Sequence, residues 1–183
     1  MIDLAITADH IRTTLHGYLD EHPEEKLAFA PILDLLDDGA DLASRKEFRG
    51  HATAGAILAR PDGRILHIHH LALDNWLLPG GHLEAQDDTL LEAALRELTE
   101  ETGIPVEAVS AAEDRPVHID VHSIPANDAK GEPAHQHIDF RFFFRTTATV
   151  HQLQAEEVDD AAWRDAEALA DERLRRRVAA AIR

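Results

Sequence analysis

The feature that most constrains this 183-residue chain is a cluster of three glutamates on one predicted helix, at about residues 88–102. The glutamates are Glu97, Glu100 and Glu101. At about 100° per residue they share one face of the helix, and apolar side chains on the opposite face can enter a core. Those apolar residues are Leu91, Ala94, Leu95 and Leu98.

Three carboxylates at this spacing destabilise an isolated helix. They repel one another at i, i+3 and i+4, and the helix dipole disfavours negative charge in the C-terminal half. One interpretation is a solvated acidic helix face in an acidic protein. The other is a site for a hard divalent cation, because Mg²⁺ is held by a few carboxylates together with substrate phosphates.

The residues around the cluster favour the cation site. The pattern Arg-Glu-apolar-any-Glu-Glu-any-Gly-apolar is matched residue by residue from Arg96 to Ile104, and Gly80-Gly81 precede the helix. This stretch resembles the Nudix box, a loop–helix–loop motif. Counting back from Arg96 puts the first box glutamate at Asp88, with six residues rather than five after Gly81. We interpret this as a loop one residue longer with Asp in place of Glu, at a position that mainly gives structural support in the family.

The resemblance implies a Mg²⁺-dependent (or Mn²⁺-dependent) hydrolase that cleaves a diphosphate linkage. Its substrate would be a nucleoside diphosphate linked to another moiety, or a related small phosphorylated metabolite. The metals would neutralise phosphate oxygens and lower the pKa of the attacking water. By the same resemblance, Glu100 and Glu101 bind metal, Glu97 binds metal or orients water, and the Gly80 carbonyl completes the coordination. Arg96 is expected to pair with a box carboxylate and hold its orientation.

The resemblance also implies a catalytic base from a loop outside the box. Three glutamates are candidates for this role, and the sequence does not choose between them. They are Glu132, Glu156 and Glu157.

Polar residues alternate along two predicted strands, so each set shares one face of a sheet. The sets are His118, Asp120 and His122, and then His135, His137, Asp139 and Arg141. They predict a hydrated, functional sheet face beside the box helix. A second metal site for Zn²⁺, Mn²⁺ or Fe, recognition of a phosphate or base, and a polar network that covers the sheet all stay open. The substrate-binding candidates are His82, directly after the glycines, with His122, His135, His137, Asp139 and Arg141.

Strand-like and helical segments interleave after residue 50. The expected strands are 52–60, 65–70, 76–78, 117–124, 135–145 and 161–163, and a last helix is expected at 171–183. This order predicts an α/β (α+β) fold around a mixed sheet, and the resemblance implies the α/β/α sandwich of Nudix enzymes. Residues 1–47 are predicted to be a helical N-terminal extension, serving as a packing or dimerisation element or as a substrate lid, and residues 48–183 the Nudix hydrolase domain.

Composition narrows the function further. Lys and Arg number 18 against 35 Asp and Glu, a net charge of −17 that argues against RNA decapping or binding of any nucleic-acid polymer. The absence of cysteine excludes thiolate sites, and with them an isopentenyl-diphosphate isomerase, which relies on a cysteine. No apolar run approaches the ~20 residues of a membrane span. We therefore expect a cytoplasmic enzyme with a small phosphorylated substrate, and a homodimer is an open option.

A rival from another class is a catalytically silent Nudix-like domain that senses a nucleotide without cleaving it. Such domains commonly lose box carboxylates, whereas this chain keeps Glu97, Glu100 and Glu101. The hydrolase is therefore the favoured prediction.

Overall fold

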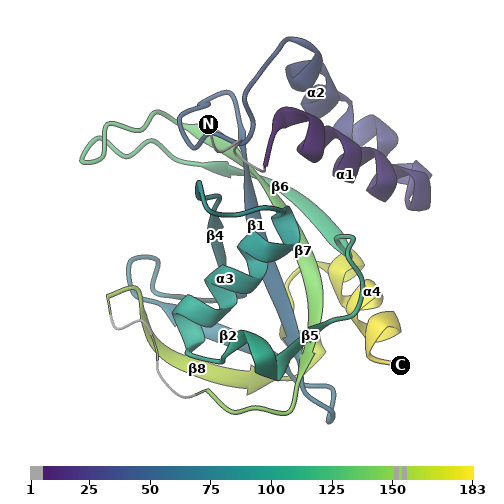
Figure 1. Ribbon diagram of the computed structural model, residues 1–183. Coiled ribbons are helices and arrows are strands. Elements are labelled where there is room, and N and C mark those ends of the chain that lie inside the picture. Colours follow the sequence, from purple (N-terminus) through teal and green to yellow (C-terminus); the bar gives the residue numbers. More distant parts are fainter. Residues whose placement is uncertain (1–5, 151–152, 154–155) are drawn as a thin grey trace.

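The centre of the fold is strand β1 (His51–Ala59), in which every residue is buried. The computed structural model describes residues 6–150, 153 and 156–183, and Figure 1 shows β1 in the middle of a mixed sheet. β1 runs parallel to β7 (His135–Thr146) along its whole length. It runs antiparallel to β2 (Ile65–His70) and to the three-residue strand β4 (Gly80–His82).

Four further strands complete the eight-stranded sheet. They are β3 (Asn75–Leu77), β5 (Val109–Ala111), β6 (His118–Ile124) and β8 (Val158–Arg164). β5 and β6 pair antiparallel with β7, and β3 and β8 pair antiparallel with β2. The predicted mixed sheet is confirmed. Strands β4 and β5 were not expected: β4 is Gly80-Gly81-His82, without an apolar side chain, and β5 is Val109–Ala111, too short to show a period of its own.

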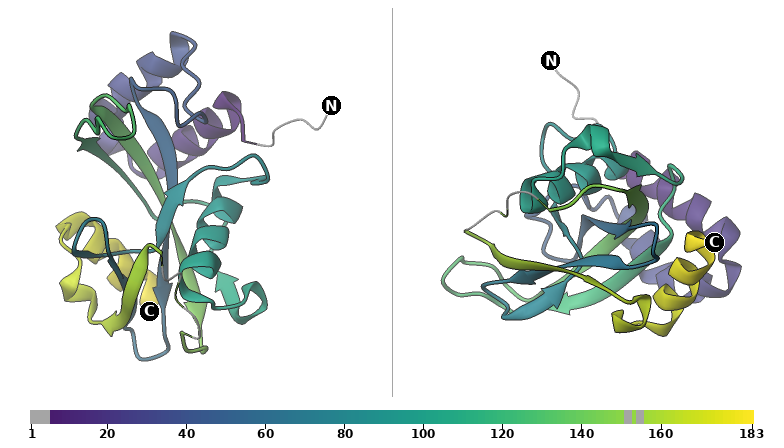
Figure 2. Two further views of the ribbon diagram at one scale, coloured as in Figure 1. Left: turned by 90° about the vertical axis from the view of Figure 1, so that its left-hand side faces the viewer. Right: turned by 90° about the horizontal axis from the view of Figure 1, so that it is seen from below.

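The two faces of the sheet are covered by different helices. The even-numbered residues of β1 lie in a core with α3 (Leu90–Thr102), α1 (Ala8–Glu21) and α2 (Lys26–Asp37). On the other face, Ile57 and Ala59 pack in a second core with α4 (Glu172–Ile182). The left view of Figure 2 shows α3 and α4 on opposite sides of the sheet. The part of the second face that begins with His51 and Thr53 lies outside that apolar core.

Residues directly next to helix α3 determine where it begins and ends. The Thr89 hydroxyl accepts a hydrogen bond from the Glu92 amide at 3.1 Å and caps the N-terminus. Gly103 has φ 67°, the left-handed conformation that ends a helix, as predicted. Small side chains, Ala93 and Ala94 on the helix and the alanines of β1, lie in the same core and permit close approach. This packing fixes where the glutamates of α3 can lie.

The N-terminal helices belong to the first core. Thr7 caps α1, the short 3-10 helix η1 (Pro23–Glu25) leads into α2, and Gly39 follows at φ 77°. Seven side chains of α1 and α2 are buried with β1 and α3: Ile11, Leu15, Tyr18, Leu19, Phe29, Ile32 and Leu36. None of the helices in the described part of the chain is both long and apolar enough to cross a membrane.

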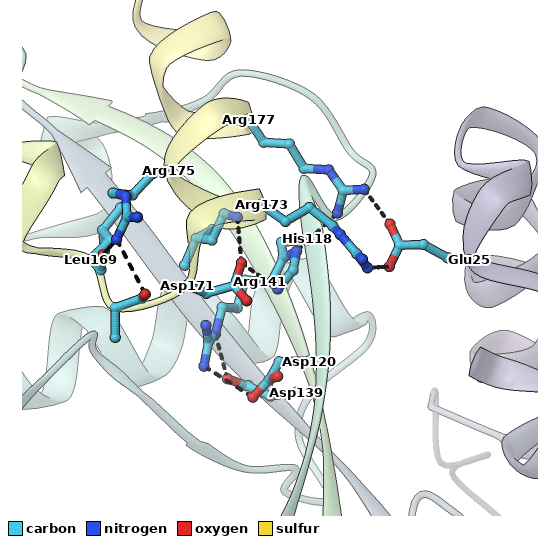
Figure 3. Close-up of polar contacts among 12 residues, drawn as sticks. Glu25, His118, Asp120, Asp139, Arg141, Leu169, Asp171, Arg173, Arg175 and Arg177 are labelled. Carbon is cyan, nitrogen blue, oxygen red and sulfur yellow. Dashed lines mark hydrogen bonds and ion pairs between the residues drawn. The ribbon is translucent and has the colours of Figure 1, made fainter.

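A buried ion pair joins these helices to α4. Glu25 is 2% exposed, and its carboxylate contacts the Arg177 guanidinium of α4 and accepts a hydrogen bond from the Tyr18 hydroxyl at 3.0 Å. Arg173 adds a second contact to Glu25 at 2.9 Å (Figure 3). The contact ties together segments that are far apart in the sequence.

We expect Glu25→Ala to lower the free energy of unfolding by about 3 kcal/mol, because it leaves the Arg177 charge without its buried partner. Urea denaturation would measure this loss. Glu24→Ala is the matched control, since the Glu24 carboxylate is 63% exposed and lies 3.8 Å from Arg177, so that its removal leaves the buried partner Glu25 in place. Equal stability of the two variants would contradict a structural role for the pair.

Candidate active site

Two glycines bring strand β4 against both β1 and helix α3. A Cβ on Gly80 would lie 2.7 Å from the Ala54 carbonyl oxygen, so no side chain fits there without moving backbone. A Cβ on Gly81 would lie 2.6 Å from the Glu97 carboxylate. The Gly80 amide donates a hydrogen bond to Glu101 Oε2 at 3.0 Å. Close approach of backbone thus requires glycine at position 80, whereas a side chain at position 81 would displace the Glu97 carboxylate.

The carboxylates of α3 lie together, as predicted, but differ in exposure. Glu101 is 2% exposed, Glu97 is partly buried and Glu100 is exposed. Burial raises the pKa of Glu101 to about 8; the Gly80 hydrogen bond opposes this, and the Glu97 charge adds to it. Burial also raises the pKa of Glu97 to about 7, against the effect of Arg96. Among the described residues Glu101 forms no ion pair with a basic side chain, so its charge lacks compensation from the protein.

Arg96 lies at the centre of the site's hydrogen bonds. Its guanidinium donates to Glu97 Oε1 at 3.0 Å and to Glu100 Oε2 at 3.1 Å, leaving the second oxygen of each carboxylate outside these bonds. It also donates to the His82 carbonyl at 3.0 Å, which holds the end of β4. The expectation that Arg96 pairs with box carboxylates agrees with these contacts.

The main partner of Arg96 corrects the prediction of Asp88. Arg96 binds both carboxylate oxygens of Asp87, at 2.8 and 3.0 Å, and Asp87 is 4% exposed whereas Asp88 is exposed. Five residues separate Gly81 from Asp87, so the spacing from glycine to acid is the family's. The extra residue is Asp88, between that acid and the cap of α3. Counting back from Arg96 failed because it placed the insertion on the wrong side of the acid.

The three candidate bases lie in different surroundings. Glu157 is close enough to α3 for its charge to contribute to the raised pKa of Glu101. Glu132 instead contacts Arg45 at 3.4 Å, on the loop before β7. Glu156 and Glu157 are both exposed, and no contribution of Glu156 to the pKa of Glu101 is among the largest. Position therefore favours Glu157, and its role as a base stays a prediction.

The polar stripes of β6 and β7 share one sheet face, as alternation predicted. Their register pairs His118 with Arg141, Asp120 with Asp139 and His122 with His137. The expectation that this face lies beside the box helix is wrong. His118 contacts Arg177 of α4 at 2.9 Å, and the intervening apolar residues pack in the core of α3. Alternation determines which residues share a face, but not which helix covers that face.

The charged members of the stripes compensate one another. Arg141 donates to Asp139 at 2.8 Å and lies 3.6 Å from Asp120 (Figure 3). Asp120 also contacts His122 Nδ1 at 2.8 Å, and the Thr53 hydroxyl donates to Asp139 at 3.1 Å. This part of the face is a paired polar network.

The other end of the face carries a cluster of imidazoles, formed by His51, His82, His135 and His137. The ring centroids of His51 lie 4.9 Å from His135 and 4.8 Å from His137, and those of His82 and His137 are 5.1 Å apart. Burial, followed by neighbouring positive groups, lowers the pKa of His82 to about 4 and of His137 to about 3. His51 was not predicted as a member of the site. It lies on the same face of β1 as Thr53, which bonds to Asp139.

Known proteins resemble this chain over most of its length. A family model described as NUDIX domain matches residues 49–182. A probable DHNTP pyrophosphohydrolase from Lactococcus lactis subsp. cremoris is 34% identical over 125 residues, covering 65% of this chain and 68% of that protein. Phosphatase NudJ of Escherichia coli is 44% identical over 59 residues, 31% of this chain and 37% of NudJ. A NUDIX-family hydrolase structure from Clostridium perfringens matches with a TM-score of 0.54 and 22% identity, over 72% of this chain and 95% of that one.

Substitution of each glycine by alanine should impair a different property, metal binding at Gly81 and thermal stability at Gly80. In Gly81→Ala the new methyl group meets the end of the Glu97 side chain, so we expect a folded protein with weaker Mg²⁺ binding. In Gly80→Ala it meets β1 backbone, so we expect lower thermal stability. Calorimetric Mg²⁺ titration and thermal melts separate the effects, and identical behaviour of the two variants would contradict the geometry.

The metal-free protein should lose stability as pH rises from about 5 to 8. Because the folded-state pKa values of Glu97 and Glu101 lie above the ordinary glutamate value of 4.5, the folded state holds more protons than the unfolded state in this window. Each group then lowers the free energy of unfolding by at most roughly 1.4 kcal/mol per pH unit. Urea denaturation in chelator checks this, and Glu101→Gln should flatten the slope. A slope in Glu101→Gln as steep as in the unchanged protein would contradict the assignment.

Proposed function

Because the chain belongs to the Nudix hydrolase family, we propose that it is a Mg²⁺- or Mn²⁺-dependent pyrophosphohydrolase acting on a small phosphorylated substrate. One observation carries the dependence on a divalent cation. Glu101 is a buried carboxylate beside Glu97 and Glu100, and no described basic side chain forms an ion pair with it. A cation is the compensation that such a donor set fits best.

The residues present suit that cation. Glu97, Glu100 and Glu101, with the Gly80 carbonyl, would hold it, and they offer only the oxygen ligands that Mg²⁺ prefers. When bound, it neutralises charge on the diphosphate and makes water a better nucleophile. The protein's own part is positioning. Arg96 holds Glu97 and Glu100 in place while Asp87 anchors Arg96.

Glu157 is our choice for the additional base. The charge of Glu157 contributes to the raised pKa of Glu101, which supports a position near the carboxylates of α3. Glu132 pairs with Arg45 and lies toward the histidines. A base has to reach water near the metal, and of the candidates Glu157 fits that requirement best.

The substrate class rests on family membership and on charge. A net charge of −17 disfavours a polyanionic polymer and favours a small ligand whose phosphates are shielded by metal. Nucleoside diphosphate derivatives are the first class to screen. DHNTP belongs in the same panel, because a relative at 34% identity is named for its hydrolysis.

A silent nucleotide-binding domain is the second candidate, and it has less support. Glu97, Glu100, Glu101 and Arg96 are all present, and Arg96 contacts Glu97 at 3.0 Å and Glu100 at 3.1 Å. Divalent-dependent hydrolysis of any member of the panel, followed by chromatographic separation of the two products, would exclude it.

We also propose residues 1–47 as an N-terminal extension to a catalytic domain at 48–183. The family match, which begins at residue 49, supports that boundary. The shared core of α1, α2 and β1 supports a packing role for the extension. A cytoplasmic location and a homodimer remain predictions.

Glu101→Gln should lose divalent-dependent turnover on the order of 100-fold or more while the protein stays folded. The amide keeps the shape of the side chain and its contact with Gly80 but removes the charge that a cation needs. Glu92→Gln, exposed on the first turn of the same helix, is the matched control and should keep its turnover. Near-normal turnover of Glu101→Gln at saturating Mg²⁺ would remove the assignment.

A further inference from the structure

We propose that His51, His135 and His137 form a second metal site, separate from the carboxylate cluster, which binds a transition-metal ion of the zinc type. Each residue offers one ring nitrogen, and these three atoms lie within 4.8 Å of one another. The sheet itself brings them together. His51 begins β1 and stands beside His137 in the parallel register, and His135 begins β7 on the same face.

Backbone carbonyls orient two of the imidazoles for metal binding. His51 Nδ1 lies 3.2 Å from the Glu47 carbonyl oxygen, and His135 Nδ1 lies 2.8 Å from that of Pro133. A carbonyl oxygen only accepts, so each Nδ1 carries the hydrogen and each Nε2 keeps a lone pair. Metal-binding histidines are typically held in this way by the ring nitrogen that does not touch the ion.

The spacing of the ring nitrogens suits a tetrahedral ion. Nε2 of His135 and Nε2 of His137 are 3.3 Å apart. Zinc–nitrogen bonds of about 2.0–2.1 Å at tetrahedral angles place two ligand nitrogens roughly 3.3–3.4 Å apart. Three neutral imidazoles match zinc and similar ions, whereas Mg²⁺ prefers oxygen ligands.

The Nε2 atom of His51 shows why a hydrogen-bonded polar network does not account for this cluster. His51 is 1% exposed, and its Nε2 is buried without a hydrogen-bond partner among the described residues. Leaving a buried acceptor unsatisfied costs about 1–3 kcal/mol. A hydrogen bond from His137 to His135 would satisfy those two rings, but not His51. An ion between the three rings satisfies all of them.

A fourth imidazole, that of His82, lies beside the three proposed ligands. His82 stands close to the cluster, with ring centroids 5.3 Å from His51 and 5.1 Å from His137. Its carbonyl is held by Arg96, so a bound ion would lie next to the strand that also contacts the carboxylates. Three protein ligands leave the fourth position for His82, water or a ligand oxygen.

The test measures metal in the full chain with the carboxylate cluster disabled. The variant carries Glu97→Gln, Glu100→Gln and Glu101→Gln together, so that these side chains cannot bind the probe as carboxylates. It is stripped with chelator, dialysed against Zn²⁺ in excess Mg²⁺, and analysed by mass spectrometry. We expect a stoichiometric amount of Zn²⁺, and a Co²⁺ form with the strong visible absorption of a tetrahedral site. Failure to retain Zn²⁺ would overturn the proposal.

Single changes in the same background identify the ligands. His135→Gln and His137→Gln should each lose most of the bound Zn²⁺, with circular dichroism confirming the fold. His51→Gln tests the third ligand. His16→Gln, exposed on α1, should retain the metal. Retention by both the His135 and His137 variants would contradict the site, and no readout depends on turnover, so failure here leaves the pyrophosphohydrolase proposal untouched.

Discussion

Burial of the Glu101 carboxylate against the Gly80 amide is the contact on which the geometry of the site depends. Carboxylates are rarely buried without a basic partner, because the free-energy cost of desolvation is large. Here a backbone amide offsets part of that cost, and the same contact positions β4 against α3. Close packing of Gly80 on Ala54 then fixes the pair relative to the central strand. The sheet, the strand and the helix thus set the carboxylate positions together.

Strand β4 also connects two chemically different regions. At one end its amide contacts Glu101, and at the other its carbonyl contacts Arg96 while the His82 ring joins the imidazole cluster. The three residues of β4 therefore contact groups on both faces of the sheet. No loop separates Gly80 from His82, so the contacts to the two clusters lie on one continuous strand.

The parts of the fold that the sequence predicted are those with a strong local period. Helix α3 and strands β6 and β7 have apolar residues at regular spacing, and their ends carry recognisable caps or turns. Asp87 was missed because its role arises from a turn, in which its amide bonds to the Glu84 carbonyl and its carboxylate turns toward Arg96. His51 was missed because only the pairing of β1 with β7 brings it beside His137. Contacts of that kind depend on register, which a single strand does not reveal.

The ion pair of Glu25 with Arg177 has a consequence for the order of folding. The partners are 152 residues apart in the sequence, so during synthesis α1 and α2 emerge long before α4 exists. Until then Glu25 has neither Arg177 nor Arg173 beside it, and the face of the sheet that α4 covers stays bare. The nascent chain therefore exposes apolar residues such as Ile57 and Phe143 until α4 leaves the ribosome.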